Sequence, residues 1–184
     1  AGFSAGKILG FSRPFAMPDG QVSEAAFRLA FASDLRSPDF YAFTCQRINP
    51  PRADRSALTM HANGAVGLAG ITLCEPHPKD FADFLGVAAH GNPPVPAGDG
   101  ISMPVGTACL SVMTHAEFEQ RFGRRYCGHA RGLRARAVSF RVGALDETAT
   151  LLRRNGVVHE MIGNRLVVAE APGQGVLYTF EEEA

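Results

Sequence analysis

The chain has 184 residues, of which 46% are hydrophobic and 20% are charged, as in many folded globular proteins. Eighteen basic residues balance eighteen acidic ones, so charge gives no reason to expect a nucleic-acid partner or an anionic membrane surface. No stretch approaches the roughly 20 apolar residues of a membrane span. The four cysteines have no paired spacing, which indicates a reducing, cytoplasmic location rather than a disulfide framework.

Residues 1–46 predict strands without a preceding helix. The strands are expected at residues 3–14, 22–32 and 40–45. The second strand alternates and places Phe27, Leu29 and Phe31 on one face. Residues 47–64 are polar and contain proline, which is typical of a linker.

Residues 65–123 predict a second unit. A strand, a helix and two further strands are expected at residues 65–74, 79–88, 101–105 and 108–113. Residues 91–100 are too rich in proline and glycine to hold a helix or a central strand. Thr114 and Glu117 have the spacing of a capping box, which predicts a short helix that ends before Gly123.

Residues 124–184 predict the most complete unit. Its strands are expected at residues 137–142, 157–162, 165–169 and 176–180. Between the first two strands, Asp146 is the expected N-cap of a helix that ends at Gly156. Gly163 and Asn164 predict a two-residue hairpin turn. The basic segment 124–136 is expected to be a solvated loop.

The predicted fold is therefore α+β and built from repeated βαβββ modules with curved mixed sheets that enclose a cleft. The repeat is complete at residues 124–184, modified at its end at 65–123, and reduced to its last three strands at 1–46. The apolar face of the reduced unit needs a cover. We expect either a homodimer or an N-terminal segment that this chain lacks to provide that cover.

The sequence resembles the vicinal oxygen chelate superfamily, which includes glyoxalase I, bleomycin-resistance proteins and extradiol dioxygenases. The likeness is greatest to its glyoxalase-like domain proteins. Three groups of segments carry the resemblance and touch all three units: FSRP (11–14) with AAFRLAFA (25–32); DFYAFTCQ (39–46) with HANGAVGLAGITL (61–73); and AVSFRVGALDETATLLRRNGV (137–157) with GVLYTF (175–180). The resemblance implies paired modules whose cleft takes a small molecule.

The resemblance also implies a divalent metal, held by a His or Gln near the start of a module's first strand and a Glu in its last strand. The metal would polarise substrate oxygens as a Lewis acid. In this sequence the first-strand positions fall near Gly70 and Ala137, and the last-strand positions fall near Thr44 and Thr179. None of these residues offers a carboxylate or an imidazole, so the expected ligand positions are not filled.

Five polar residues are the candidates for ligand binding in the cleft. They are Arg13, Gln46, His61, His159 and Glu181. His61 opens a turn before a strand, and Gln46 ends a strand expected to line the cleft. The guanidinium of Arg13 is suited to pairing with an anionic ligand. His159 belongs to a predicted strand, and Glu181 begins the acidic C-terminal segment. A local structural role explains each residue as well.

Two functions remain open from the sequence. One is a glyoxalase- or dioxygenase-like enzyme, a lyase or a dioxygenase, that uses a divalent metal, and it rests on fold analogy. The other is a metal-free protein of the bleomycin-resistance type that binds or sequesters a small molecule. The second function rests on the missing metal ligands and on sheet aromatics such as Phe40, Tyr41 and Tyr178.

Overall fold

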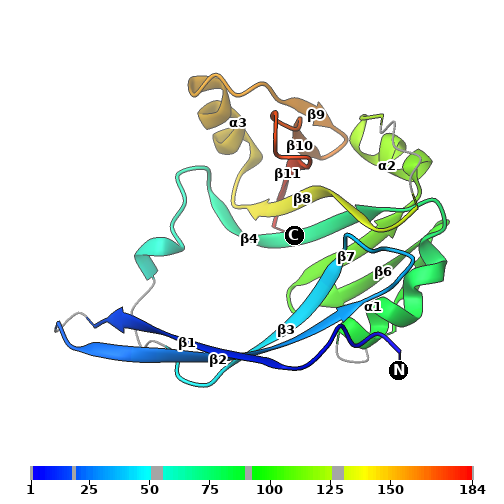
Figure 1. Cartoon of the computed structure of the whole chain (residues 1–184). Coiled ribbons are helices and arrows are strands. Elements are labelled where there is room, and N and C mark those ends of the chain that lie inside the picture. The colour runs from blue at the N-terminus through cyan, green and yellow to red at the C-terminus, as the bar shows by residue number, and fades with distance from the viewer. Residues whose placement is uncertain (1, 18–19, 51–55, 90–92, 126–130, 184) are drawn as a thin grey trace.

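The structure is a computed structural model, and it describes residues 2–17, 20–50, 56–89, 93–125 and 131–183. Its strands form a three-stranded sheet in the order β1-β2-β3 and an eight-stranded sheet in the order β5-β6-β7-β4-β8-β11-β10-β9. Figure 1 shows the three-stranded sheet running below the large sheet and extending beyond it. The predicted α+β class is confirmed: both sheets are curved and unclosed, and helices are few.

The three-stranded sheet is an antiparallel meander of the first unit. Its strands are β1 (Leu9–Ala16), β2 (Val22–Ser33) and β3 (Tyr41–Arg47). The first strand begins later than predicted, and only an isolated bridge joins Ser4 to Ala32 before it. Register pairs Phe11 with Phe27, whose rings stack at 5.1 Å between centroids. The aromatic side chains therefore share one face of this sheet.

The first half of the large sheet follows the order strand, helix, strand, strand, strand. A short 3-10 helix, η1 (Ser56–Leu58), precedes it. The elements are β4 (Ala65–Cys74), η2 (Pro78–Phe81), α1 (Ala82–Ala88), β5 (Val95–Ala97), β6 (Gly100–Val105) and β7 (Ala108–Met113). The segment predicted to hold no central strand contains β5. It is an edge strand, where the missing N–H of Pro96 costs no ladder bond.

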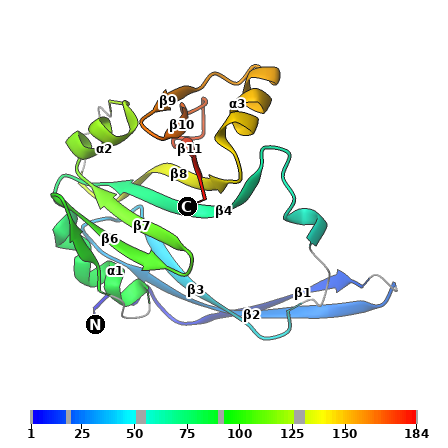
Figure 2. The same ribbon diagram turned by 180° about the vertical axis from the view of Figure 1, so that it is seen from behind.

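The second half repeats this order after a connecting helix, α2 (His115–Phe122). Its elements are β8 (Arg134–Val142), α3 (Leu145–Arg154), β9 (Glu160–Ile162), β10 (Arg165–Val168) and β11 (Leu177–Glu182). In each half the first and last strands pair in parallel, and β4 and β8 join the halves in antiparallel fashion. Figure 2 shows α2 and α3 above opposite ends of β4 and β8.

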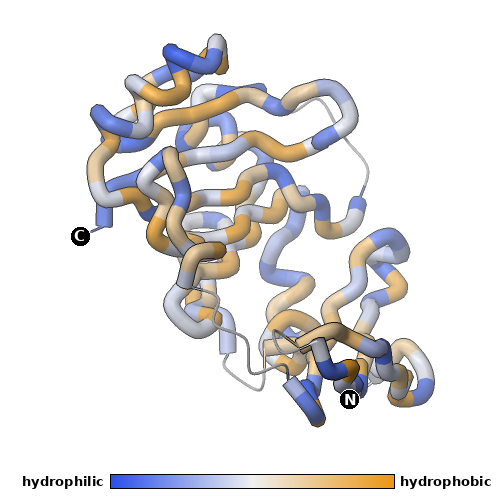
Figure 3. Tube along the Cα trace, turned by 90° about the vertical axis from the view of Figure 1, so that its left-hand side faces the viewer, coloured by the Kyte–Doolittle hydropathy of each residue, from blue (hydrophilic) through white to orange (hydrophobic). Residues whose placement is uncertain are grey.

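The two faces of the large sheet carry different helices. Ile71 and Leu73 of β4 pack in the cluster that includes Phe84 of α1. Leu166 and Phe180 pack in the cluster that includes Ala149 of α3. On the opposite face, α2 packs through its two phenylalanines in a cluster that contains Ala137, Val167 and Leu177. We call these faces the α1–α3 face and the α2 face. Figure 3 shows hydrophobic positions recurring along the strands between polar ones.

The capping box of α2 is confirmed, but the predicted cap of α3 is wrong. Thr114 accepts a bond from the Glu117 N–H, and the Glu117 carboxylate accepts one from Thr114 N–H at 3.0 Å. Helix α3 begins at Leu145, so Asp146 is already helical. The carboxylate of Glu182 accepts from the Leu145 N–H at 3.0 Å and satisfies the helix start from β11 instead.

The basic segment 124–136 is not the solvated loop that we expected. Arg131 Nε donates to the buried carboxylate of Glu75 at 3.0 Å, and its Nη2 donates to Asp80 at 2.9 Å. Arg134 pairs with Asp39 at 2.6 Å, so this segment ties the large sheet to the three-stranded sheet. These arginines are fixed by acidic partners that are distant in the sequence. Residues 126–130 of this segment, with Cys127 and His129, lie outside the described residues.

Candidate functional site

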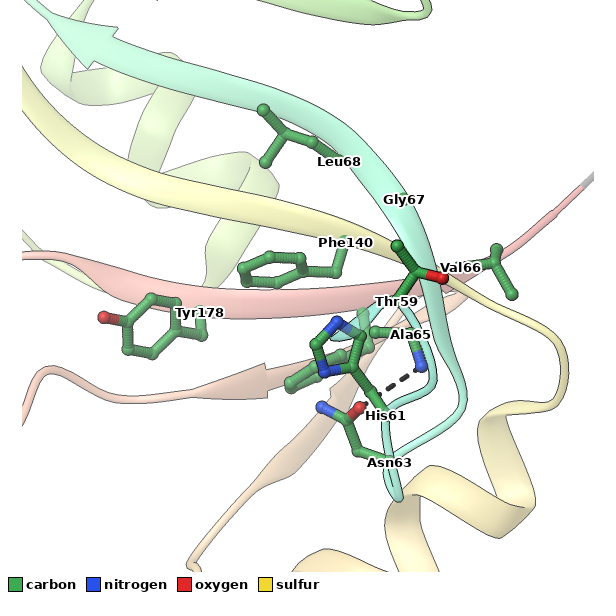
Figure 4. Close-up of a pocket in the computed structure, with 10 residues that line it drawn as sticks. Thr59, His61, Asn63, Ala65, Val66, Gly67, Leu68, Phe140 and Tyr178 are labelled. Atoms are coloured by element: carbon green, nitrogen blue, oxygen red, sulfur yellow. Dashed lines mark hydrogen bonds between the residues drawn. The ribbon is translucent and has the colours of Figure 1, made fainter. Parts of the chain in front are cut away.

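A cavity of about 640 Å³ lies on the α1–α3 face, where the first strands of the two halves meet. It is lined by residues from β4, β8, β11 and the segment before β4: Thr59, His61, Asn63, Ala65, Val66, Gly67, Leu68, Phe140, Tyr178 and Phe180. Figure 4 shows the strands that contribute these side chains. This volume lies within the range of ligand sites, about 300–1,000 Å³.

Three aromatic rings form the apolar part of the cavity. Parallel pairing sets Phe140 of β8 beside Phe180 of β11, and their ring centroids are 5.9 Å apart. The Tyr178 ring lies 6.2 Å from the Phe140 ring. Antiparallel pairing places Leu68 of β4 opposite Phe140 on the other side. These spacings are typical of interacting rings, and the rings are tilted by 25° and 39° to one another, so they form a curved apolar wall.

A turn of residues 61–64 places the polar groups of the cavity. The N–H of Gly64 donates to the carbonyl oxygen of His61 at 2.9 Å, and Gly64 has a φ of +71°, which favours glycine. The side-chain oxygen of Asn63 accepts from the N–H of Ala65 at 3.2 Å. The buried Thr148 hydroxyl donates to the Asn63 carbonyl oxygen at 2.8 Å. His61 is therefore carried by a turn that α3 holds against the sheet.

Of the five predicted site residues, His61 lines this cavity and the other four lie elsewhere. Arg13 and Gln46 belong to the three-stranded sheet, where Arg13 lies 5.9 Å from the Phe27 ring centroid. Gln46 ends β3, and β3 contributes no residue to the described lining of this cavity. The strand predicted at 157–162 begins only at Glu160 in the structure, so His159 precedes β9. Its Nδ1 lies 2.9 Å from the carbonyl oxygen of Val157.

Glu181 lies one residue beyond Phe180 on β11. Side chains of successive strand residues point to opposite faces, so Glu181 belongs to the α2 face. There its carboxylate lies 3.5 Å from Arg165 Nη2. It is therefore part of an ion pair rather than a solvated terminus or a group of the cavity.

The residues present do not fit the metal that the family resemblance implies. Three of the expected ligand positions, Gly70, Ala137 and Thr179, lie on the α2 face and not in this cavity, and none carries a carboxylate or an imidazole. The cavity itself offers one imidazole, His61, and neither a carboxylate nor a thiol among the described lining residues. Within the described ranges, no group of three or more His, Cys, Asp or Glu side chains could hold a metal ion. A divalent metal usually takes three or four protein ligands of these types. No chemical step through a metal is therefore derived.

The aromatic residues Phe140 and Phe180 were not found as site residues from the sequence. The alternation within 137–142 and 176–180 did indicate that they share a face of their strands. This alternation alone could not show that the two residues are neighbours. The parallel register of β8 and β11, which puts them side by side, was also needed.

The chain matches no family model, and no curated protein matches it. Among solved structures, a hypothetical protein from Staphylococcus aureus aligns with a TM-score of 0.55 at 7% identity. The alignment covers 96% of this chain and 57% of the other, so the chain spans little more than half the length of that protein. This likeness shows the fold.

Two further structures align over most of their own length. One is methylmalonyl-CoA epimerase from Mycobacterium tuberculosis, with a TM-score of 0.48 and 15% identity over 68% of this chain and 93% of that one. The other is a selenomethionyl methylmalonyl-CoA epimerase, with a TM-score of 0.43 and 12% identity over 64% and 94%. No helix in the described parts of the chain is long and apolar enough to cross a membrane.

Proposed function

We propose that this protein binds a small aromatic or apolar molecule, without a metal, in the cavity over Phe140, Tyr178 and Phe180. The supporting observation is the joined aromatic surface, on which the three rings lie within 6.2 Å of one another between neighbouring centroids. A ligand ring that stacks there gains both apolar burial and ring contact.

The polar groups around the cavity specify where a ligand's polar atoms go. His61 and Asn63 enter from the turn, and Tyr178 brings a hydroxyl to the aromatic side. A small number of polar groups in an apolar cavity fixes orientation and gives specificity. The ligand class is therefore a planar apolar compound with a hydrogen-bonding group at one edge.

The alternative that the resemblance implies, a metal-dependent lyase or dioxygenase, has less support. Its chemistry needs carboxylate or imidazole ligands converging on one point. The cavity has only His61 of these types among its described lining residues. We therefore favour the sequestering type of function. We also propose a reducing, cytoplasmic location, which the free thiols of Cys45, Cys74 and Cys109 support.

A thermal-shift screen with planar aromatic compounds tests the proposal. A compound that binds the folded state raises the unfolding temperature by mass action. Phe140→Ala is expected to abolish the shift. Val158→Ala is the control, because Val158 is 81% exposed and lies outside the cavity. A flat screen, or a shift that Phe140→Ala leaves unchanged, contradicts the proposal.

A further inference from the structure

Small polar side chains gather on the α2 face of the large sheet, opposite the aromatic cavity. Register places Gly70 beside both Cys109 and Ser139, at the junction of the two halves. The Thr179 hydroxyl donates to Ser139 Oγ at 2.7 Å, across β11 and β8. In the other half, Ser102 Oγ and Cys109 Sγ are 2.9 Å apart. This part of the α2 face is therefore lined by small polar side chains, with Arg141 two residues beyond Ser139 on the same face.

Two arginines lie beside one aromatic ring of α2. The guanidinium carbon of Arg121 is 5.6 Å from the Phe122 ring centroid, and that of Arg165 is 6.0 Å from the same centroid. Two positive groups are therefore held near one side chain. Like charges so placed repel each other unless an anion lies between or beside them.

The carboxylate of Glu181 compensates only part of this charge. It lies 3.5 Å from Arg165 Nη2, which is a long contact for an ion pair. Within the described ranges, the Arg121 side chain forms no ion pair and no hydrogen bond. Its guanidinium contacts the Phe122 ring. The two arginines and Glu181 thus carry one net positive charge.

The electrostatics of Arg121 agree with this geometry. The Arg121 residue is solvent-accessible, but packing around its guanidinium removes part of its hydration and lowers its pKa, and the nearby charge of Arg165 lowers it further. Cys109 and Glu181 lie close enough to influence the same group. An incoming anion offsets the repulsion between the two guanidinium groups.

We propose that Arg121 and Arg165 bind a small oxyanion, a carboxylate or a phosphate group, on the α2 face. A guanidinium offers a planar fork of donors that matches both groups, and the guanidinium carbons of both arginines lie within 6.0 Å of the same ring centroid. The positive charge disfavours a divalent cation here, so the proposed ligand has a charge opposite to that of the metal implied by the family resemblance. The site is independent of the aromatic cavity.

Calorimetric titration at constant ionic strength tests the site, with inorganic phosphate and acetate as separate probes. Saturable binding of either probe is expected for the unaltered protein, and the probe that binds more tightly identifies the class of oxyanion. Arg121→Gln is expected to weaken binding at least about tenfold, because hydrogen bonds to charged groups are lost. Glu181→Gln is expected to tighten binding, because it removes the competing carboxylate.

Arg125→Gln is the matched control. Arg125 follows the same helix, is 80% exposed, and pairs only loosely with Glu119 at 3.7 Å. The Arg125→Gln variant should bind each probe as tightly as the unaltered protein. The melting temperature without probe should be similar for all variants. Failure of both probes to bind saturably, or equal weakening by Arg121→Gln and Arg125→Gln, would overturn the assignment whatever the aromatic cavity binds.

Discussion

The hydroxyl of Thr148 in α3 donates a 2.8 Å hydrogen bond to the carbonyl oxygen of Asn63, and the Thr148 side chain is completely buried. This bond connects α3 to the turn that carries His61. Thr148→Val keeps the shape but leaves the carbonyl oxygen without its donor. We expect a loss of about 1–3 kcal/mol in the free energy of unfolding, measured by urea denaturation.

Thr148→Ser provides the control for that prediction, because it keeps the hydroxyl. If the bond positions the turn, Thr148→Val should also weaken binding of a cavity ligand, whereas Thr148→Ser should weaken it much less. Equal ligand affinity in the two variants would show that the turn needs no support from α3.

The buried carboxylate of Glu75 accepts from one neighbouring and two distant donors. It accepts from Arg131 Nε at 3.0 Å, from the N–H of Gly132 at 3.3 Å and from the N–H of His77. Arg131→Ala removes the charged donor but leaves the two backbone donors. We expect the denaturation midpoint to fall, because the buried carboxylate loses its charged donor. The same truncation at exposed Arg125 should change stability by less than about 0.5 kcal/mol.

Stability should fall in acid because of Asp34. The Arg36 guanidinium donates to this carboxylate at 2.6 and 3.0 Å and holds the Asp34 pKa below its usual value. A carboxyl with a lowered folded pKa stabilises the fold above the unfolded pKa, about 3.9, and loses this contribution as pH falls through the folded pKa. Denaturation midpoints should therefore drop below about pH 4.

Asp34→Asn should make this acid-dependent drop smaller, while the protein at pH 7 becomes less stable. Asp146→Asn, at an exposed position of α3, should leave the pH dependence as it is. An unchanged pH profile in Asp34→Asn would show that the Arg36 pair contributes nothing to acid sensitivity.

The aromatic face of the three-stranded sheet should mediate self-association. Leu9, Phe11 and Phe43 are 52%, 45% and 58% exposed on this face, and a two-fold dimer would cover the same patch on both copies. Sedimentation should show a dimer at micromolar concentration. Phe11→Lys should shift it to the monomer, whereas Ser12→Lys, on the opposite face of β1, should not. A monomeric parent protein contradicts this prediction.

Local features were predictable from the sequence. The capping box of Thr114 and Glu117 depends on residues three apart, and the hairpin at Gly163 and Asn164 depends on the turn residues themselves. The α+β class with its βαβββ order followed from periodicity. The partial exposure of apolar residues of β2 was also predictable, because the sequence of residues 1–46 has no helical pattern that could cover them.

The rest depends on pairing between distant segments. Asp146 failed as a cap because Glu182, 37 residues beyond Leu145, supplies the acceptor. From the sequence, His61 was named as a site residue and Tyr178 as a sheet aromatic that supports ligand binding, and both line the cavity. Phe140 and Phe180 were missed, because they become neighbours only through the register of β8 and β11. No spacing within either strand carries that information.

Methyl NMR during a ligand titration tests the central claim most directly. With an aromatic compound identified in the thermal screen, the methyl signals of Ala65, Val66 and Leu68 should shift, because these residues line the cavity. The signals of Leu9 on the three-stranded sheet and of Val167 on the α2 face should stay in place. Shifts at Leu9 or Val167 with unchanged signals from Val66 and Leu68 would place the ligand elsewhere and contradict the account.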